Sequence, residues 1–487
     1  MRYRKVLLLN AAYKKNYYDL QAELPVGLGY IAEALKREGI EYDVLDMDLG
    51  YKFKDLVEKV FSFKPELIGL SMMSPCYKNN YELIGKIKNK FPSVDLVVGG
   101  PHISLMKEKV MEGCRGIDLG VLGEGEMTMV KLCRGEELKS IKGLLFREDG
   151  EIINTGPCDF IQDLDFLGFP KYERFELGMY KDVHRDKKLR IPLSTSRGCP
   201  YSCTFCMGYI SLGKKFRPRS VESVVKEMEY WYQEGHKDIR IIDDNFTMRK
   251  ERVYEICDEI KKKKLSDLRL SCDNGIRADK VDKDLLLRMR EVGFWKLDFG
   301  VEAGNNRILK NIKKKEKIEV IEEAIKVACE VGFDVELTFL IGSPGETWSD
   351  IQDGVDLALK YPIVSAEWYH IEPYPGTKLH EWLRERGFIV KAPHEYLNSH
   401  SRRRNYPIFI TPELSLKDRK KAWKYTRRVI KKIIIRATKR KLGDLKILGK
   451  VIACIYGNFL LRNLFIGNNI IREFFVYPVR KRAKLSP

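Results

Sequence analysis

Residues 196–206 read SRGCPYSCTFC and place Cys199, Cys203 and Cys206 at spacings of four and three. A tetrahedral zinc site needs four ligands, and no further His, Cys or Asp follows these thiols at the usual zinc spacing. Three thiolates can instead hold three irons of a four-iron cluster, which leaves the fourth iron open for another ligand. The spacing therefore favours a [4Fe–4S] cluster with one open iron.

The chain before this loop alternates strand-like and helical runs. Examples are KVLLLN (5–10), GLGYIAEALKREG (27–39), ELIGLSMMS (66–74) and VDLVVGGPH (94–102). Such alternation predicts an α/β fold in which helices cover a parallel sheet. We expect a doubly wound, Rossmann-like domain over residues 1–140, followed by a linker over 141–189.

A second alternating series begins just before the cysteines. It includes IPLSTSRGC (191–199), DIRIIDDNF (238–246), FWKLDFGVEAG (294–304) and DVELTFLIGSPGE (334–346). About six strand and helix pairs predict a full or partial TIM-like barrel over residues 190–390, with its chemistry in the loops that follow the strands. The cysteine loop follows the first of these strands.

The remaining residues, 391–487, form a basic extension. Residues 401–487 hold 24 Lys and Arg against four acids, a formal charge of +20. The whole chain carries +19, so residues 1–400 are nearly neutral, at 19 − 20 = −1. The stretch DRKKAWKYTRRVIKKIIIRATKRK (418–441) predicts a basic helix, and the later apolar residues are too interrupted to predict a membrane-spanning helix. A helical cap over the barrel mouth, an interfacial membrane anchor and an RNA-binding tail are the alternatives.

The start of the chain lacks the apolar core of a secretory signal, and its 11 cysteines show no disulfide-like spacing. These features predict reduced thiols and a cytoplasmic protein, with peripheral contact at the inner face of the membrane if the basic extension anchors it.

At the cysteine loop the chain resembles the radical S-adenosylmethionine (SAM) enzymes, whose Cys-x3-Cys-x2-Cys loop is matched by Cys199, Cys203 and Cys206. The resemblance extends over roughly residues 190–390. It implies that the open iron chelates SAM and that electron transfer releases a 5′-deoxyadenosyl radical. An external donor of the flavodoxin or ferredoxin type is then expected to supply the electron.

Three further motifs are similar to the SAM contacts of that family. They are IDDNFT, for the methionine ammonium, GVEAGNN, for the ribose or methionine part, and LIGSPGET, for the adenine. EPYPGT (372–377) is similar to a last-strand signature of the subset with an amino-terminal cofactor domain. The candidate SAM-binding residues are Asp243, Asp244, Asn245, Glu302, Gly342, Pro344 and Glu346.

A doubly wound domain in front of this barrel is similar to the cobalamin-binding radical SAM enzymes. The candidate cobalamin-binding residues are Ser71, Ser74, Gly99, Gly100, His102, Gly123 and Gly125. Cobalamin proteins that ligate the cobalt use Asp-x-His-x-x-Gly, whereas this chain has Asp46-Met47-Asp48 and no histidine there. The cobalt should then lack an imidazole from this loop, or the domain has lost its cofactor.

The resemblance implies a class B radical SAM methyltransferase that methylates an unactivated carbon of a small molecule. If the basic extension anchors the protein at the membrane, a membrane lipid or isoprenoid would suit it as substrate. The alternatives are radical carbon–carbon bond formation or cyclisation, with cobalamin structural or absent, and a non-catalytic corrinoid or iron–sulfur carrier. We expect an active site that is apolar apart from its SAM contacts, because a radical must be kept from water. Nucleic acid is disfavoured as a partner, because the sequence of the basic extension predicts a helical segment.

Overall fold

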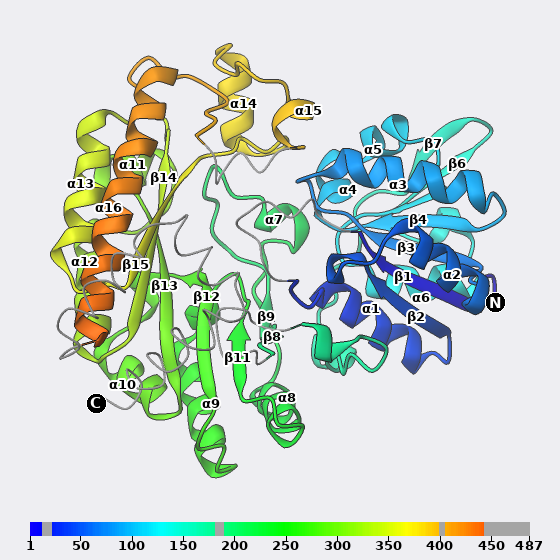
Figure 1. The fold of residues 1–487 in the computed structure, drawn as a ribbon, viewed down its shortest axis with the longest axis horizontal. Coiled ribbons are helices and arrows are strands. Elements are labelled where there is room, and N and C mark those ends of the chain that lie inside the picture. Colours follow the sequence, from blue (N-terminus) through cyan, green and yellow to red (C-terminus); the bar gives the residue numbers. More distant parts are fainter. Residues whose placement is uncertain (12–21, 181–188, 399–404, 443–487) are drawn as a thin grey trace.

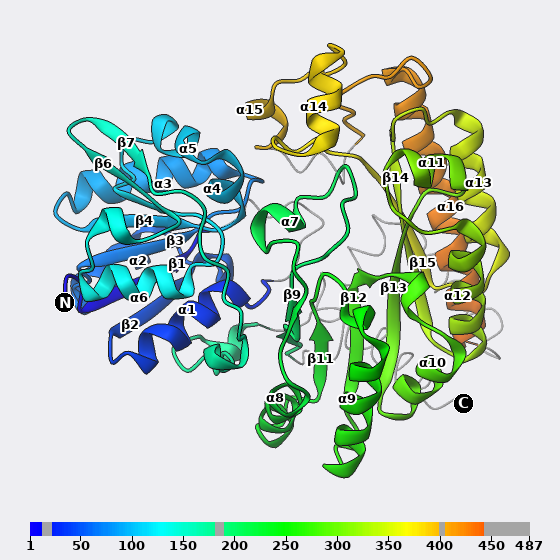
Figure 2. The same cartoon turned by 180° about the vertical axis from the view of Figure 1, so that it is seen from behind.

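A computed structural model describes residues 1–11, 22–180, 189–398 and 405–442 (Figure 1). Two α/β units lie beside each other, and the short helix α7 (Gly208–Ser211) lies between them in both views (Figures 1 and 2). The predicted α/β fold class is confirmed.

The amino-terminal unit is a seven-stranded sheet with the strand order β2-β1-β3-β4-β5-β6-β7. Strands β1 to β5 are parallel, and β6 and β7 pair antiparallel at the edge. The strands are β1 (Lys5–Asn10), β2 (Glu41–Asp46), β3 (Leu67–Ser71), β4 (Asp95–Gly99), β5 (Leu119–Val121), β6 (Leu144–Glu148) and β7 (Glu151–Asn154). The helices are α1 (Val26–Arg37), α2 (Phe53–Phe63), α3 (Tyr77–Lys90), α4 (Pro101–Met106), α5 (Glu108–Gly113) and α6 (Glu126–Arg134).

Both faces of this sheet are buried. In β1, Val6 and Leu8 belong to one apolar cluster, and Leu7 and Leu9 belong to another on the opposite face. A parallel sheet covered on both faces needs such a continuous apolar strand. The sheet extends to Asn154, past the expected boundary at residue 140, because the β6–β7 hairpin completes its edge.

The second unit is a six-stranded parallel sheet with the order β15-β14-β13-β12-β11-β8, an open partial barrel. Its strands are β8 (Ile191–Leu193), β11 (Asp238–Ile241), β12 (Arg269–Ile276), β13 (Phe294–Glu302), β14 (Asp334–Ile341) and β15 (Ser365–His370). Its helices are α8 (Val221–Gln233), α9 (Lys250–Lys262), α10 (Lys283–Glu291), α11 (Asn306–Asn311), α12 (Ile318–Glu330) and α13 (Trp348–Lys360). The partial form of the predicted barrel is the correct one.

The outer and inner faces of the barrel strands differ sharply. In β14, Val335, Leu337 and Phe339 are buried beneath the helices, whereas Glu336 and Thr338 alternate with them on the partly exposed inner face. Period-2 alternation of this kind marks one apolar face and one polar face of a strand. The inner face of β14 therefore carries polar side chains, which the expectation of an apolar site did not include.

The cysteine loop is closed at its base by a two-stranded antiparallel bridge between β9 (Ser196–Arg197) and β10 (Arg217–Pro218). After the barrel, α14 (Lys378–Glu385) and α15 (Pro393–Tyr396) return to the amino-terminal unit. There the Cys76 N–H donates to the carbonyl of Asn398 at 3.3 Å. The two units are thus joined both at the cysteine loop and beyond the barrel.

The basic helix predicted for the extension is present as α16 (Leu416–Leu442), which lies along β15 and α13 (Figure 1). Ala422, Val429 and Ile433 on it join the main apolar core. Arg436 donates to the carbonyls of Leu359 and Tyr361, where α13 ends, and basic groups suit a helix carboxyl terminus. The helix is therefore part of the barrel wall and does not cap the barrel mouth.

The described residues contain no helix that is both long enough and apolar enough to cross a membrane. The apolar part of the extension, for which a membrane anchor was one interpretation, lies outside the described residues.

Candidate active site

The three cysteines lie on one loop at the carboxyl end of the barrel sheet, between β9 and α7. All three are partly buried, and burial raises their pKa values, that of Cys206 to about 12. Within the described residues no three His, Cys, Asp or Glu side chains are gathered into a metal site. The fit to an iron–sulfur cluster therefore comes from the donor set, three neighbouring thiols without another ligand.

Two cations lie beside this loop. Lys314 and Arg277 are buried, and their charges lower the pKa values of Cys199 and Cys203, although burial outweighs them. The Arg277 guanidinium lies 3.5 Å from the ring centroid of Tyr201 within the cysteine loop. Thiolates and an anionic cluster are favoured by nearby positive charge, so this surrounding suits three metal-bound thiolates.

The two aspartates that follow β11, Asp243 and Asp244, have different surroundings. Asp243 is buried and accepts hydrogen bonds from the Thr195 N–H, at 2.6 Å, and from the hydroxyls of Thr195 and Ser196. It therefore ties β11 to the strand that leads into the cysteine loop. Asn245 is also buried, and its amide lies 3.5 Å from the sulfur of Met248.

Asp244 points elsewhere. Its Oδ2 atom is buried without a hydrogen-bond partner in the described part of the chain, and burial raises its pKa. A Cβ placed on Gly208 would lie 3.4 Å from the Cys206 sulfur and 3.7 Å from Asp244 Oδ1, so the carboxylate adjoins the third cysteine. A buried acceptor beside the cluster loop fits the ammonium group of SAM.

Replacing Asp244 by Asn should weaken SAM binding by about 10- to 100-fold, because a hydrogen bond to a charged group contributes about 1.5–3 kcal/mol. The measurement is equilibrium dialysis of SAM against cluster-loaded protein under anaerobic conditions. Iron content serves as the control and should stay at the wild-type level. Unchanged SAM affinity in a variant with a full complement of iron would contradict this role for Asp244.

Glu302, at the end of β13, is a non-glycine residue with φ +67° and accepts a hydrogen bond from Lys314 Nζ at 3.2 Å. Such left-handed conformations cost energy and cluster at functional sites. The ion pair links the strand end to a cation that lies beside the cysteine loop.

The LIGSPGET motif holds a buried carboxyl group beside an arginine of the extension. Glu346 accepts hydrogen bonds from the backbone N–H groups of Gly342 and Ser343, and Arg419 of α16 lies beside it. A Cβ on Gly342 would lie 1.6 Å from Arg419 Nη1. The glycine therefore makes room for an arginine of the extension, whereas Pro344 lies in the loop and its carbonyl accepts from Asn311 at 2.8 Å.

Burial raises the pKa of Glu346 to about 7 from an ordinary 4.5, against the opposing effects of the two N–H donors and Arg419. The folded chain then keeps a proton that the unfolded chain loses, so stability falls as pH rises from 4.5 to 7. Glu346→Gln should remove up to about 3 kcal/mol of this pH dependence. Thermal denaturation at pH 5 and pH 8 tests it. The exposed Glu385→Gln is the control, and an unchanged pH dependence in Glu346→Gln would refute the assignment.

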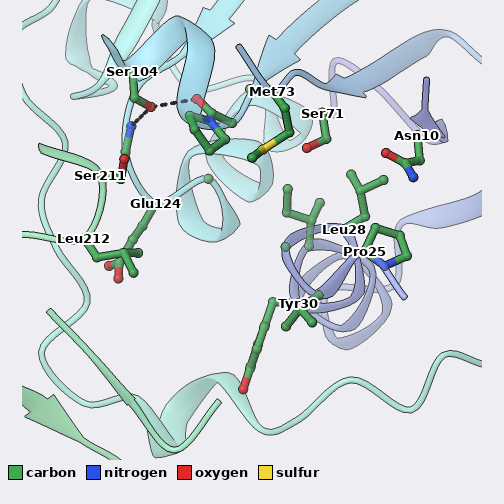
Figure 3. A pocket seen from close by; sticks show the side chains of 18 of the residues that line it. Asn10, Pro25, Leu28, Tyr30, Ser71, Met73, Ser104, Glu124, Ser211 and Leu212 are labelled. Atoms are coloured by element: carbon green, nitrogen blue, oxygen red, sulfur yellow. Dashed lines mark hydrogen bonds between the residues drawn. The ribbon is translucent and has the colours of Figure 1, made fainter. Parts of the chain in front are cut away.

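A cavity of about 980 Å³ lies between the two units. It is close to the upper end of the range for cofactor pockets, about 300–1,000 Å³. Asn10 and Ser71, at the ends of β1 and β3, line it, and these strands flank the switch point where ligands bind in doubly wound sheets (Figure 3). Among the described residues, Asp244 alone of the seven predicted SAM-binding residues lines the cavity, from the second unit, and the three cysteines do not line it.

Five of the seven residues predicted to contact cobalamin line this cavity: Ser71, Gly99, Gly100, Gly123 and Gly125. A Cβ on Gly99 would meet only Val121, at 3.9 Å, so it would project into open space. Gly100 and Gly123 instead meet the protein's own atoms closely, which makes them turn residues as well. Ser104, which sequence reasoning missed, joins their two loops through Gly100 O and the Gly123 N–H, at 2.9 Å each (Figure 3).

The other two residues, Ser74 and His102, do not line the cavity. Both are buried; His102 Nδ1 lies 3.1 Å from Ser74 Oγ, and its ring stacks on Tyr77 at 4.5 Å. Burial lowers the pKa of His102 to about 4, so the ring is neutral. No histidine occurs among the described residues that line the cavity. Asp48, which stands where cobalt-ligating proteins have their histidine motif, does line it. A flat ligand against the glycines fits this lining, and the described part of the lining offers no imidazole to its cobalt.

Comparison with known proteins agrees with this arrangement. Residues 193–358 match the radical SAM superfamily and residues 21–133 match the B12 binding domain. An uncharacterized methyltransferase of Pyrococcus horikoshii is 32% identical over 374 residues, which cover 75% of this chain and 80% of that protein. The chain belongs to the B12-binding radical SAM enzymes. The cofactors of this radical SAM enzyme are a [4Fe–4S] cluster, SAM and cobalamin, and a non-catalytic carrier is excluded.

Two further relatives of this B12-binding radical SAM enzyme carry named activities. Cytidylyl-2-hydroxyethylphosphonate methyltransferase of Streptomyces wedmorensis is 28% identical over 454 residues, which cover 80% of this chain and 83% of that protein. Anaerobic magnesium-protoporphyrin IX monomethyl ester cyclase of Cereibacter sphaeroides is 27% identical over 387 residues, which cover 76% of this chain and 63% of that protein.

Solved structures share the fold. The cobalamin-dependent S-adenosylmethionine radical enzyme OxsB has a TM-score of 0.74 at 18% identity, covering 99% of this chain and 75% of that one. The radical S-adenosylmethionine methyltransferase TsrM of Kitasatospora setae, with cobalamin and a [4Fe–4S] cluster bound, has a TM-score of 0.66 at 21% identity, covering 80% of this chain and 79% of that one.

Proposed function

We propose that this protein transfers a methyl group to an unactivated carbon of a small molecule. One observation carries the proposal: a single cavity has strand ends of the B12 domain on one side and Asp244, beside the cysteine loop, on the other. A methyl donor on one wall and a radical source on the other would both reach a substrate between them. A methyl transfer that uses both cofactors needs that shared space.

When bound, the cofactors supply a carbon-centred radical by hydrogen abstraction and a methyl group carried on cobalt. The chain's own residues orient them. Asp244 accepts the N–H donors of the SAM ammonium, and Cys199, Cys203 and Cys206 hold the cluster. Lys314 and Arg277 stabilise its negative charge, and the glycines of the B12 domain allow a flat macrocycle to lie against the backbone.

The substrate class follows from the composition of the walls. Apolar lining comes mainly from the B12 domain, whereas the barrel contributes mostly polar side chains: Ser194, Ser196, Arg197, Ser211, Asp244, Asn274, Tyr369 and Glu372. A polar wall costs free energy when it is covered by a saturated hydrocarbon. We therefore favour a substrate with hydrogen-bonding groups over the membrane lipid or isoprenoid that the basic extension first suggested.

The test is anaerobic incubation of cobalamin-loaded protein with SAM carrying a deuterated methyl group and a strong chemical reductant. Methyl transfer predicts S-adenosylhomocysteine with label in the corrinoid fraction, and 5′-deoxyadenosine once a substrate is present. Screening polar and lipid cell extracts separately for deuterated products distinguishes the substrate classes. Failure to form S-adenosylhomocysteine in a protein that binds both cofactors would reject methyl transfer. Exchanging the reductant for flavodoxin or ferredoxin tests the predicted electron donor.

Radical cyclisation is the second candidate, favoured by the likeness to the magnesium-protoporphyrin cyclase. It predicts 5′-deoxyadenosine without S-adenosylhomocysteine in the same assay.

A further inference from the structure

Four charged side chains are buried where the B12 domain meets the base of the cysteine loop. They are Glu124, Glu126, Arg197 and Arg217, and each is at most 8% exposed. Arg217 donates to both carboxylate oxygens of Glu124, at 2.8 and 2.9 Å, and the Ile161 N–H adds a third donor at 2.8 Å. Arg197 donates to Oε1 of Glu124 at 3.1 Å and to Oε1 of Glu126 at 2.7 Å.

The two carboxylates differ in one respect. Both oxygens of Glu124 have donors from the protein, whereas Oε2 of Glu126 is buried and has no hydrogen-bond partner in the described ranges. Glu126, at the start of α6, is only 4% exposed and, like Glu124, lines the cavity. A buried carboxylate oxygen without a donor costs about 1–3 kcal/mol or more, so such atoms are rare unless a ligand completes them.

Arg197 fixes the direction of this oxygen. The guanidinium holds Oε1 of Glu126, and it lies 4.8 Å from the ring centroid of Tyr30, which also lines the cavity. With Oε1 held, the carboxylate cannot turn Oε2 toward another protein donor without losing that ion pair. The described residues supply no donor to Oε2, so a molecule in the cavity that carries an N–H or O–H group is the candidate donor.

We propose that Glu126 is a cobalamin-binding residue whose Oε2 accepts an N–H from an amide side chain on the rim of the corrin ring. Cobalamin is the preferred donor because Glu126 belongs to the B12 domain, next to Gly123 and Gly125 of the same wall. The amino group of SAM is the other N–H donor that could occupy the cavity. The inference rests on the proposed function only in requiring cobalamin in this cavity.

The test titrates hydroxocobalamin and, separately, SAM into cluster-loaded protein without substrate. Glu126→Ala should weaken hydroxocobalamin binding by about 10- to 100-fold, the contribution of a hydrogen bond to a charged group, and leave SAM affinity within about threefold. Glu126→Gln keeps an acceptor without the charge and should recover part of the loss. Glu124→Gln, which removes a charge from the same cluster but leaves Oε2 of Glu126 in place, should bind hydroxocobalamin within about threefold of wild type.

Unchanged hydroxocobalamin affinity in Glu126→Ala would overturn the inference, and so would an equal loss in Glu124→Gln, which would make the cluster a structural clamp. Loss of SAM affinity alone would assign the donor to SAM and also overturn it. Equal loss of both affinities would also overturn the inference, because it would indicate a collapsed cavity and not the loss of one hydrogen bond to cobalamin. Wild-type protein that binds no hydroxocobalamin would instead reject the proposed function.

Discussion

A Cys203→Ala variant should lose its cluster and form no 5′-deoxyadenosine. Three thiolates are the whole protein donor set that we assign to the cluster, and within the described residues no His, Asp or Glu is arranged with them to replace a lost ligand. Two thiols leave two irons without protein ligands, so the cluster should be released on purification. Loss of the cluster removes the electron needed to cleave SAM.

The measurement is iron and sulfide quantification, followed by 5′-deoxyadenosine detection in the same anaerobic preparation. Cys329→Ala is the matched control, because Cys329 is also partly buried but lies on α12, outside the loop. It should keep wild-type iron and activity. A Cys203→Ala protein with about four irons that still cleaves SAM would show that the cluster has another ligand set.

Strand ends and the cysteine loop could be predicted from the sequence because both depend on short-range pattern. Apolar runs of strand length fixed the places of β1, β3 and β14, and the parallel sheet then brought their carboxyl ends to one edge. Asp243 and Asp244 could not be told apart in this way. Their roles depend on which carboxylate meets Thr195 and Ser196 in the folded chain, and those partners are more than 40 residues away.

Long-range packing accounts for the other differences. Gly123 and Gly125, in the stretch GEGE (123–126), were predicted to bind cobalamin. The two glutamates of this stretch instead meet Arg197 and Arg217 from the second unit. The adenine contact of Gly342 stays a prediction, and its open side holds Arg419 from α16, some 77 residues later, which the motif did not indicate. The charge of the extension suggested a membrane or a cap, whereas Ala422, Val429 and Ile433 pack into the barrel core. Charge counts cannot reveal such an interrupted apolar stripe.

Gly198→Ala should destabilise the neck of the cysteine loop and lower its iron content. Gly198 has φ +84°, and a Cβ there would lie 2.3 Å from the carbonyl oxygen of Lys215 and 3.1 Å from that of Gly213. The left-handed conformation alone costs a non-glycine residue about 1–3 kcal/mol, and forcing the two backbone segments apart adds about 1–3 kcal/mol. The carbonyls belong to the returning arm of the loop, so relief of the clash must open the β9–β10 bridge.

Gly235→Ala separates these two costs. Gly235 has nearly the same φ, +82°, but a Cβ there would meet nothing within 4 Å. It should show the conformational cost alone and keep its iron, because it lies after α8 and outside the loop. Thermal midpoints and iron content of both variants therefore decide the matter. If Gly198→Ala loses no more stability than Gly235→Ala and keeps a full cluster, the glycine before Cys199 serves only the turn, and the close approach of the two arms does not position the thiols.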